Sequence, residues 1–381
     1  MNSRERVLTT LAHGQPDRIP LDLGSTLVTG IMRNSYLRLA EHLGQKVTSL
    51  ELYDSIQQLA VMEESILETL QVDTRGLIPN FGRKNPVLQE QNGVYHFTDE
   101  WSMVWEKPRD SLYFNLMESP LAGDITEKDI EDFPWPRGDD PALFEGLEKK
   151  AQRYYQNGYA VILESLCSGI FEMSCRMRGL EQFYMDLSLN PELAVKLLDK
   201  FVELKIQYYQ AAAEKLGDYI QCVKEADDVA GQETLLMSPQ MYRDLIKPRH
   251  KQLFDAQRKF FPPPFYIFLH SDGAIFDIIP DFIEIGVQIL NPVQLTAQGM
   301  EAERIKSEYG KDLCFWGGGV NTQEILPTGT PQEVRQNVKD RIAALAPGGG
   351  YVFATVHNIQ DDVPKENVIA LFEAFKEMRN Y

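Results

Sequence analysis

The segment Phe265-Tyr-Ile-Phe-Leu269 runs directly into His270-Ser-Asp-Gly273, so that an apolar stretch ends in ionisable residues and a glycine. Its aromatic and β-branched side chains are typical of a buried strand, and a helical period follows the glycine, as in a βα unit. Five further segments repeat this pattern: residues 159–163, 219–223, 287–290, 313–316 and 351–355. Two weaker candidates at 18–22 and 76–79 raise the count to the eight strands that close a parallel (β/α)8 TIM barrel.

The stretch from about 80 to 140 departs from this βα rhythm. Val94-Tyr-His-Phe97 and Trp101-Ser-Met-Val-Trp105 alternate in the manner of a β-hairpin, and proline-rich loops follow them. We interpret the stretch as an insertion over the barrel mouth and not as a separate domain. Residues 1–381 are therefore expected to form a single α/β domain.

Three capping motifs elsewhere in the chain predict where helices begin. Ser238, Asn190 and Thr330 each precede a proline, which places a capping side chain before a proline at the first helical position. These dipeptides predict three helix N-termini on the outside of the barrel.

Charge and composition exclude several classes of partner. The chain carries 38 basic and 56 acidic residues, so its net charge of −18 repels the phosphate backbone of nucleic acids. Four cysteines in a chain of 381 residues are too few for a disulfide framework and fit a reducing compartment. The N-terminal sequence is polar, and no run of 18 apolar residues occurs, so we expect a cytoplasmic protein with no membrane partner.

Ionisable residues follow four of the predicted strands, where the active sites of parallel barrels lie. The most specific pattern is His270-Ser-Asp272, because residues i and i+2 of an extended segment project to the same side and can hold one ion. His357, or alternatively Glu164, would provide a third ligand. The competing interpretation is that His270 only forms a hydrogen bond to Asp272 or to the backbone and packs the barrel mouth.

Asp227 and Asp228 follow the fourth predicted strand. The like charges of Glu225 and Asp227 favour a raised carboxyl pKa, which suits a general acid. A solvated loop or a helix cap explains these aspartates equally well.

Several motifs together resemble the uroporphyrinogen decarboxylase-like barrels, a family that includes the methylcobamide-dependent methyltransferases. The resemblance covers nearly the whole chain. It rests on seven segments: Asp17-Arg-Ile-Pro20, Asp227-Asp-Val-Ala-Gly231, His270-Ser-Asp-Gly273, Asn291-Pro-Val-Gln294, Phe315-Trp-Gly-Gly318, Pro347-Gly-Gly-Gly-Tyr351 and Val356-His-Asn-Ile-Gln360.

Particular residues separate the two branches of this family. The porphyrinogen decarboxylases carry an arginine-rich RQAGR segment after the first strand, but the corresponding stretch here, Leu23-Gly-Ser-Thr-Leu-Val-Thr-Gly30, has no arginine to bind carboxylates. Asp227 would correspond to the aspartate that those enzymes use. In the methyltransferase branch an HxC pair and a later cysteine bind zinc. His270 matches the first ligand, Asp272 replaces a cysteine, and His357 stands near the last ligand.

The resemblance implies a corrinoid-dependent methyltransferase. Zinc would be held by His270, Asp272 and His357, and the methyl group would move between a small molecule and a corrinoid on a separate partner protein. Because oxygen and nitrogen ligands make a harder site than thiolates do, we expect a methoxylated, aromatic substrate. The Asp-x-His-x-x-Gly pattern of cobalamin-binding domains does not occur in the sequence.

The resemblance also suggests roles for other residues. Glu164 and Asp227 would act as a fourth ligand or as a proton source. Tyr53, Trp316, Asn291 and Gln294 are expected to bind the substrate. Trp101 and Trp105 are further candidates for aromatic walls of the substrate pocket. Barrels of this family often pair, so a homodimer is one expectation. A decarboxylase of a small carboxylated substrate, and a non-catalytic protein that binds a corrinoid protein, remain the alternative interpretations.

Overall fold

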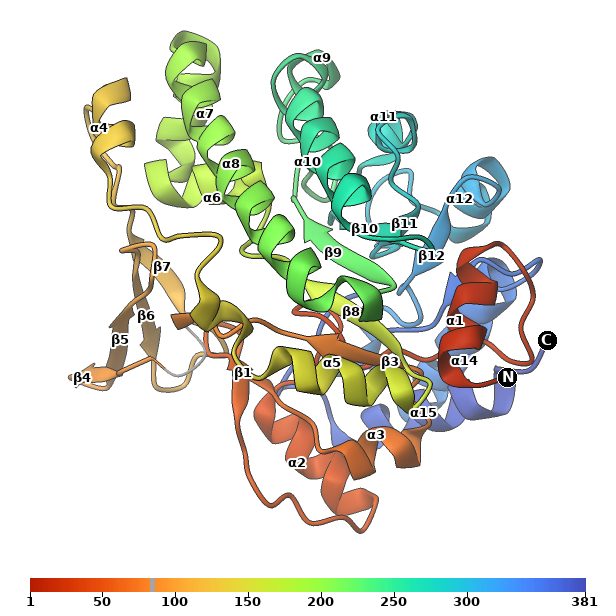
Figure 1. Ribbon diagram of the computed structural model, residues 1–381. Coiled ribbons are helices and arrows are strands. Elements are labelled where there is room, and N and C mark those ends of the chain that lie inside the picture. The colour runs from red at the N-terminus through yellow and green to blue at the C-terminus, as the bar shows by residue number, and fades with distance from the viewer. Residues whose placement is uncertain (83–85) are drawn as a thin grey trace.

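In a computed structural model, which describes residues 1–82 and 86–381, parallel strands form the centre of the molecule (Figure 1). The sheet has the order β13-β12-β11-β10-β9-β8-β3. Its strands are β3 (Thr74–Leu77), β8 (Ala160–Glu164), β9 (Cys222–Ala226), β10 (Tyr266–His270), β11 (Ile289–Asn291), β12 (Cys314–Trp316) and β13 (Tyr351–Val352). All neighbouring pairs are parallel, which confirms the predicted βα architecture.

The segment around Leu21 closes the sheet into a barrel. Phe353 N–H donates to Pro20 O and Asp22 N–H donates to Phe353 O, each at 2.9 Å, and Asp73 N–H donates to Leu21 O at 2.8 Å. The predicted strand at 18–22 is thus reduced to a single bridge. Pro20 has no N–H to give, and Leu21 N–H donates to the Asp73 carboxylate at 2.9 Å instead of to a strand.

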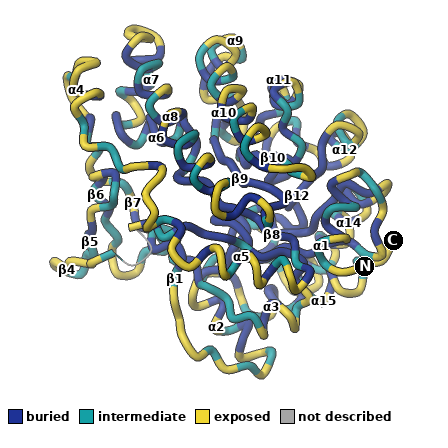
Figure 2. The backbone as a smooth tube through the Cα atoms, in the orientation of Figure 1, coloured by how far each residue is buried: buried dark blue, intermediate teal, exposed yellow. Residues whose placement is uncertain are grey.

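Helices surround this sheet, and their outer faces are exposed while the strands are buried (Figure 2). The helices are α1 (Ser3–Leu11), α2 (Arg33–His42), α3 (Glu64–Leu70), α4 (Glu127–Asp132), α5 (Leu147–Gln156), α6 (Ile170–Arg178), α7 (Leu180–Leu189), α8 (Pro191–Leu216), α9 (Pro239–Met241), α10 (Lys247–Phe260), α11 (Ile279–Glu284), α12 (Ala302–Tyr309), α13 (Ile325–Thr328), α14 (Pro331–Leu345) and α15 (Lys365–Met378). Among the described residues, no helix is both long and apolar enough to span a membrane.

The predicted helix starts are present, with one difference. Ser238 accepts a hydrogen bond from Met241 N–H at 3.1 Å, and Thr330 forms a reciprocal capping box with Glu333. Asn190 precedes Pro191 as expected, but its side chain makes no capping bond.

Strand periodicity decides which side chains enter the barrel. Alternate residues of the strands form an apolar cluster inside it, which includes Ile162, Cys222, Phe268 and Ile289. Two residues further along their strands, in the direction of the C-terminal ends, the inward positions become polar. These positions are occupied by Glu164, Lys224, His270 and Asn291. The apolar floor of the barrel therefore ends in a polar layer, which is the base of the site.

The predicted insertion forms a small antiparallel sheet with the strands β4 (Gln89–Gln91), β5 (Val94–Thr98), β6 (Val104–Pro108) and β7 (Asn115–Glu118). The predicted hairpin is confirmed, because Phe97 of β5 pairs with Trp105 of β6. Residues 83–85 of the insertion lie outside the described part of the chain. Phe114 N–H donates to Ile56 O at 3.1 Å, so this sheet supports the loop that carries Ile56. The hairpin of β1 (Leu52–Asp54) and β2 (Leu59–Ala60) encloses that loop.

Candidate metal centre

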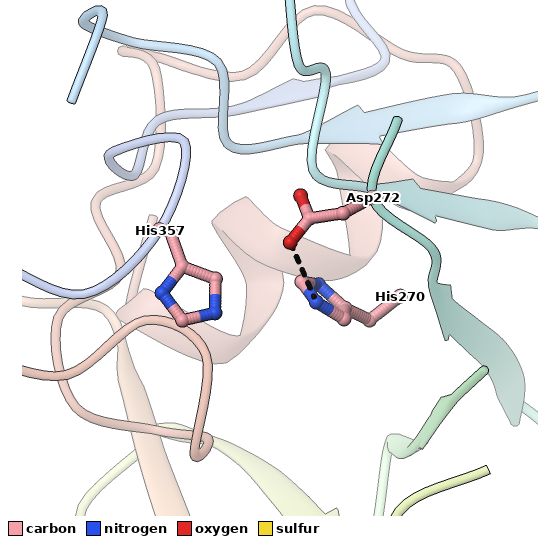
Figure 3. Close-up of side chains that lie close together, drawn as sticks. All are labelled: His270, Asp272 and His357. Carbon is pink, nitrogen blue, oxygen red and sulfur yellow. Dashed lines mark ion pairs between the residues drawn. The ribbon is translucent and has the colours of Figure 1, made fainter. Parts of the chain in front are cut away.

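Three predicted ligands converge at the C-terminal end of the barrel (Figure 3). Ligand atoms of His270, Asp272 and His357 all lie within 4.8 Å of one another. His270 Nε2 is 3.6 Å from Asp272 Oδ2, and the rings of His270 and His357 have centroids 5.6 Å apart. Two imidazoles and a carboxylate in this arrangement are suitable donors for a divalent cation such as zinc.

Local backbone structure brings these side chains together. His270 is the last residue of β10, and Asp272 follows in the turn that Gly273 completes. Gly273 has a φ of +94°, and a β-carbon there would lie 2.5 Å from Gly231 O, so the turn requires glycine. The Gly273 N–H donates to Gln294 Oε1 at 2.6 Å. His357 lies in the loop after β13, where its carbonyl accepts the Thr355 hydroxyl at 2.6 Å.

The charges in the cluster influence one another. Burial alone would lower the pKa of His270, but the carboxylates of Asp272 and Asp228 outweigh this effect and raise it. Burial opposes ionisation of Asp272, but His270 holds the pKa of that carboxyl below its usual value. Burial lowers the pKa of His357 to about 4, so its imidazole is neutral near pH 7 and has a lone pair for a metal.

A cavity of about 150 Å³ opens beside His270 and His357. Leu27, Val28 and Ile56 supply apolar walls from two loops above the barrel. The ionisable residues that line the cavity, besides the two histidines, are Asp54, Glu164, Cys167, Glu172, Arg176, Lys224 and Asp228. The cavity is thus small, largely polar and richer in carboxylates than in cations.

Each lysine or arginine that lines the described cavity is already paired with a carboxylate of the same cavity. Lys224 Nζ lies 3.1 Å from Glu164 Oε1, and Arg176 Nη2 lies 3.1 Å from Glu172 Oε1. A substrate with several carboxylates would have to break these pairs before it could bind.

Glu164 is anchored by its neighbours on both oxygens. Leu27 N–H donates to Oε2 at 2.7 Å, while Oε1 accepts Ser165 N–H at 3.1 Å and faces Lys224. The carboxylate thereby ties the loop at Leu27 to the barrel. It also lines the cavity, so a role for Glu164 in the site stays a prediction.

Asp227 lies outside the residues that line the cavity. Its Oδ1 accepts Glu172 N–H at 2.9 Å, and its Oδ2 accepts Phe171 N–H at 3.0 Å and contacts His250 Nε2 at 2.9 Å. The carboxylate therefore caps the first turn of α6, which is the helix-cap alternative. Asp228 lines the cavity instead, and its Oδ1 lies 3.9 Å from His270 Nε2. Burial and the nearby Glu172 raise the pKa of Asp228 to about 7.

The residues expected to bind substrate fall in different places. Asn291 lies behind His270, with its Oδ1 at 2.6 Å from His270 Nδ1, and Gln294 supports the Gly273 turn. Trp316 is fully buried inside the barrel and donates through Nε1 to Asp22 Oδ2 at 2.8 Å. Tyr53 lines a second cavity, of about 120 Å³, next to Arg75.

The two aromatic walls expected from the insertion also lie away from the cavity. The Trp101 ring packs on Phe201 with a centroid separation of 5.7 Å. Trp105 Nε1 donates to Asp99 Oδ2 at 2.8 Å. Trp101 thus packs the insertion against α8, Trp105 binds within the insertion, and neither lines the cavity.

The sequence analysis gave Lys224 no place in the site and assigned the acid role to Asp227, whereas the structure places Lys224 and Asp228 in the cavity wall. The predicted fourth strand at 219–223 starts too early, because Gly217–Tyr219 form a short 3₁₀ helix and β9 begins at Cys222. In the observed strand the inward parity of Cys222 and Lys224 continues to Asp228. Strand parity was thus the signal that could have found both residues.

Comparison with known proteins agrees with this fold. A methyltransferase from Methanosarcina mazei superposes with a TM-score of 0.66 at 16% sequence identity, over 99% of each chain. A β-glucosidase from Pyrococcus furiosus matches 94% of this chain and 95% of its own at 10% identity, but with a TM-score of only 0.43. No curated protein matches the sequence significantly. The sequence profile for uroporphyrinogen decarboxylase (URO-D) matches residues 125–378. The chain therefore belongs to the uroporphyrinogen decarboxylase family.

Proposed function

We propose that this protein is a zinc-dependent methyltransferase that moves a methyl group between a methoxylated small molecule, aromatic in the simplest case, and a corrinoid carried by a separate protein. The observation that carries the proposal is the convergence of His270, Asp272 and His357 beside a cavity at the C-terminal end of the barrel. Its fold, shared over the full chain with a methyltransferase, supports the same class of reaction.

The donor set fits zinc. Catalytic zinc sites have three protein ligands and leave a position for substrate, and one common set, two imidazoles and a carboxylate, matches the number and kind of groups here. Zinc held by these residues would supply a Lewis acid for the heteroatom that carries the methyl group. Because no thiolate is among these three groups, an oxygen-bearing substrate is the better match.

The protein's own residues would bind and orient the substrate. Leu27, Val28 and Ile56 would contact its carbon framework and exclude water from that side of the cavity. Asp228, next to His270, is the carboxyl group placed to hold or deliver a proton at the heteroatom. The corrinoid would come from a partner protein that docks at the barrel mouth.

Decarboxylation of a small carboxylated substrate is the less favoured alternative. Lys224 and Arg176 are each engaged by a carboxylate in the cavity, so neither is free to bind a substrate carboxylate. Asp227, the residue on which that chemistry would depend, is occupied by two backbone N–H groups and His250.

Metal content tests the proposal directly. Protein purified without chelators should contain about one zinc per chain, and His270→Ala should lose it because one of three ligands is removed. His42→Ala is the matched control, since His42 is an exposed histidine on α2 and should leave the zinc in place. Elemental analysis of the three proteins measures this outcome.

Activity provides the second measurement. Mixed with a reduced corrinoid protein and a methoxybenzene, wild-type protein should convert the Co(I) spectrum to that of methylcobalt(III), and chelator treatment should abolish the change. Wild-type protein that contains no zinc and keeps its activity after chelation would overturn the proposed function.

A further inference from the structure

Asn291 lies directly behind the predicted ligand His270. The two residues face each other across the paired strands β10 and β11, and Asn291 is completely buried. Its Oδ1 is 2.6 Å from His270 Nδ1, and its Nδ2 is 2.6 Å from the carbonyl oxygen of Trp316. Both ends of the amide are therefore engaged.

The Trp316 carbonyl fixes the orientation of this amide. A carbonyl oxygen only accepts hydrogen bonds, so the NH₂ end of Asn291 must face Trp316 and the oxygen end must face His270. An amide oxygen also only accepts, so the His270 Nδ1 that it faces must carry the proton. The neutral ring then has its lone pair on Nε2, which is the nitrogen that faces Asp272.

The carboxylates on the Nε2 side of the His270 ring favour the opposite tautomer, with the proton on Nε2. Asp272 Oδ2 lies 3.6 Å from Nε2, and Asp228 Oδ1 lies 3.9 Å from it. Both carboxylates would attract a proton to Nε2, where it would block a metal. The strong contact with Asn291 on the opposite side opposes that shift.

The contacts around the Asn291 amide hold it in a fixed orientation. Trp316, whose carbonyl it binds, is itself held through its indole N–H by Asp22, and Asp22 accepts the Thr74 hydroxyl at 2.6 Å. Gly317 gives the amide room, because a β-carbon there would lie 3.0 Å from Asn291 Nδ2. Asn291 thus cannot easily turn over to present its NH₂ group to His270.

We propose that Asn291 is a positioning residue that keeps the proton of His270 on Nδ1 and so leaves Nε2 free to bind the metal. The inference rests on the proposed function insofar as His270 is a metal ligand. It assigns Asn291 a role behind the ligand, in place of the direct contact with substrate that the sequence suggested. Groups of this kind behind a metal-bound histidine are worth about 10–100-fold in metal affinity.

The test begins with metal-free protein, so that it does not depend on the metal site being correct. In protein labelled with ¹⁵N-histidine, stripped with chelator and studied at a pH high enough for the His270 ring to be neutral, two-dimensional ¹H–¹⁵N spectra report which ring nitrogen carries the proton. His270, identified by its absence from the His270→Gln spectrum, should show a protonated Nδ1. In Asn291→Leu, which removes the acceptor and keeps the volume, the proton should move to Nε2.

Zinc affinity, measured by competition with a chromophoric chelator, is the second readout. Asn291→Leu should bind zinc about 10–100-fold more weakly than wild type. Asn291→Asp keeps an acceptor for Nδ1–H and should retain most of the affinity. Asn367→Leu is the control, because Asn367 is a buried asparagine on α15 that donates to Leu326 O and Gly329 O at 2.8 Å, away from the cavity. It should lose stability but not affinity.

The outcomes separate this inference from the proposed function. A neutral wild-type His270 with its single proton on Nε2, or equal zinc affinities for wild type and Asn291→Leu, would overturn the role of Asn291 while leaving the metal site intact. A wild-type Nδ1–H tautomer in a protein with no zinc affinity would instead overturn the metal site. If Asn291→Leu does not fold, the wild-type spectrum and the affinity of Asn291→Asp still decide the matter.

Discussion

Lys205→Met is expected to lower the free energy of unfolding by about 3–5 kcal/mol, the range for removal of one partner from a buried ion pair. Lys205 projects from α8 and is fully buried, with Nζ 2.8 Å from Glu225 Oε2 and 3.1 Å from the Cys167 carbonyl. Glu225 is buried as well and also accepts the Tyr209 hydroxyl. Methionine fills the same space but leaves the Glu225 carboxylate without its cation.

The same helix supplies the control. Lys200 lies one and a half turns earlier on α8 and pairs with Glu203, whose side chain is half exposed. Lys200→Met should therefore cost no more than about 1 kcal/mol. Adding Glu225→Gln to Lys205→Met should recover part of the loss, because the unpaired charge disappears. Urea unfolding followed by circular dichroism measures all four proteins, and equal losses for the two single lysine variants would contradict the argument.

Asp227→Ala is expected to reduce stability by about 2–4 kcal/mol, because it leaves two N–H groups of the first turn of α6 and the His250 ring without their acceptor. The folded variant should nevertheless match wild type in zinc content, and the proposed methyl transfer should remain within about tenfold of the wild-type rate. The reason is that the Asp227 side chain supports α6 from behind and does not line the cavity.

For Asp228→Asn we expect the reverse of Asp227→Ala, with an effect on activity and little effect on stability. Asp228 lines the cavity next to His270, while an asparagine there can still accept the Asp272 N–H that Asp228 binds at 2.8 Å. Stability should change little and turnover should fall. If Asp227→Ala instead loses activity by several orders of magnitude at full folding, the decarboxylase-like use of Asp227 would regain support.

Much of the fold was predictable because strand signals are local. An apolar run that ends in ionisable residues and a glycine identified β10 to within one residue, and the i, i+2 spacing of His270 and Asp272 placed both side chains together. His357 could be added because parallel strands all end at the same face of a barrel. The cluster follows from these two regularities.

What the sequence did not reveal depends on contacts between distant segments. Asp227 was assigned from the like charge of Glu225 and from the family resemblance, and neither indicates which of two adjacent aspartates lines the cavity. The observed strand β9 begins three residues after the predicted start, and its inward parity leads to Asp228. The pairing of Lys224 with Glu164, and the placement of Trp316 inside the barrel, arise from register between strands. A single sequence carries no local signal for such register.

The mouth of the barrel joins segments from opposite ends of the sequence. Asn358 accepts the Gly30 N–H at 2.6 Å and donates to the Leu27 carbonyl at 2.9 Å, while Leu21 bridges to Phe353. During synthesis on the ribosome, the early loop at residues 27–30 has no partner until the segment around 358 has emerged. The nascent protein therefore has no assembled cavity until that segment has emerged, and we expect affinity for substrate and for the proposed metal only from that point on.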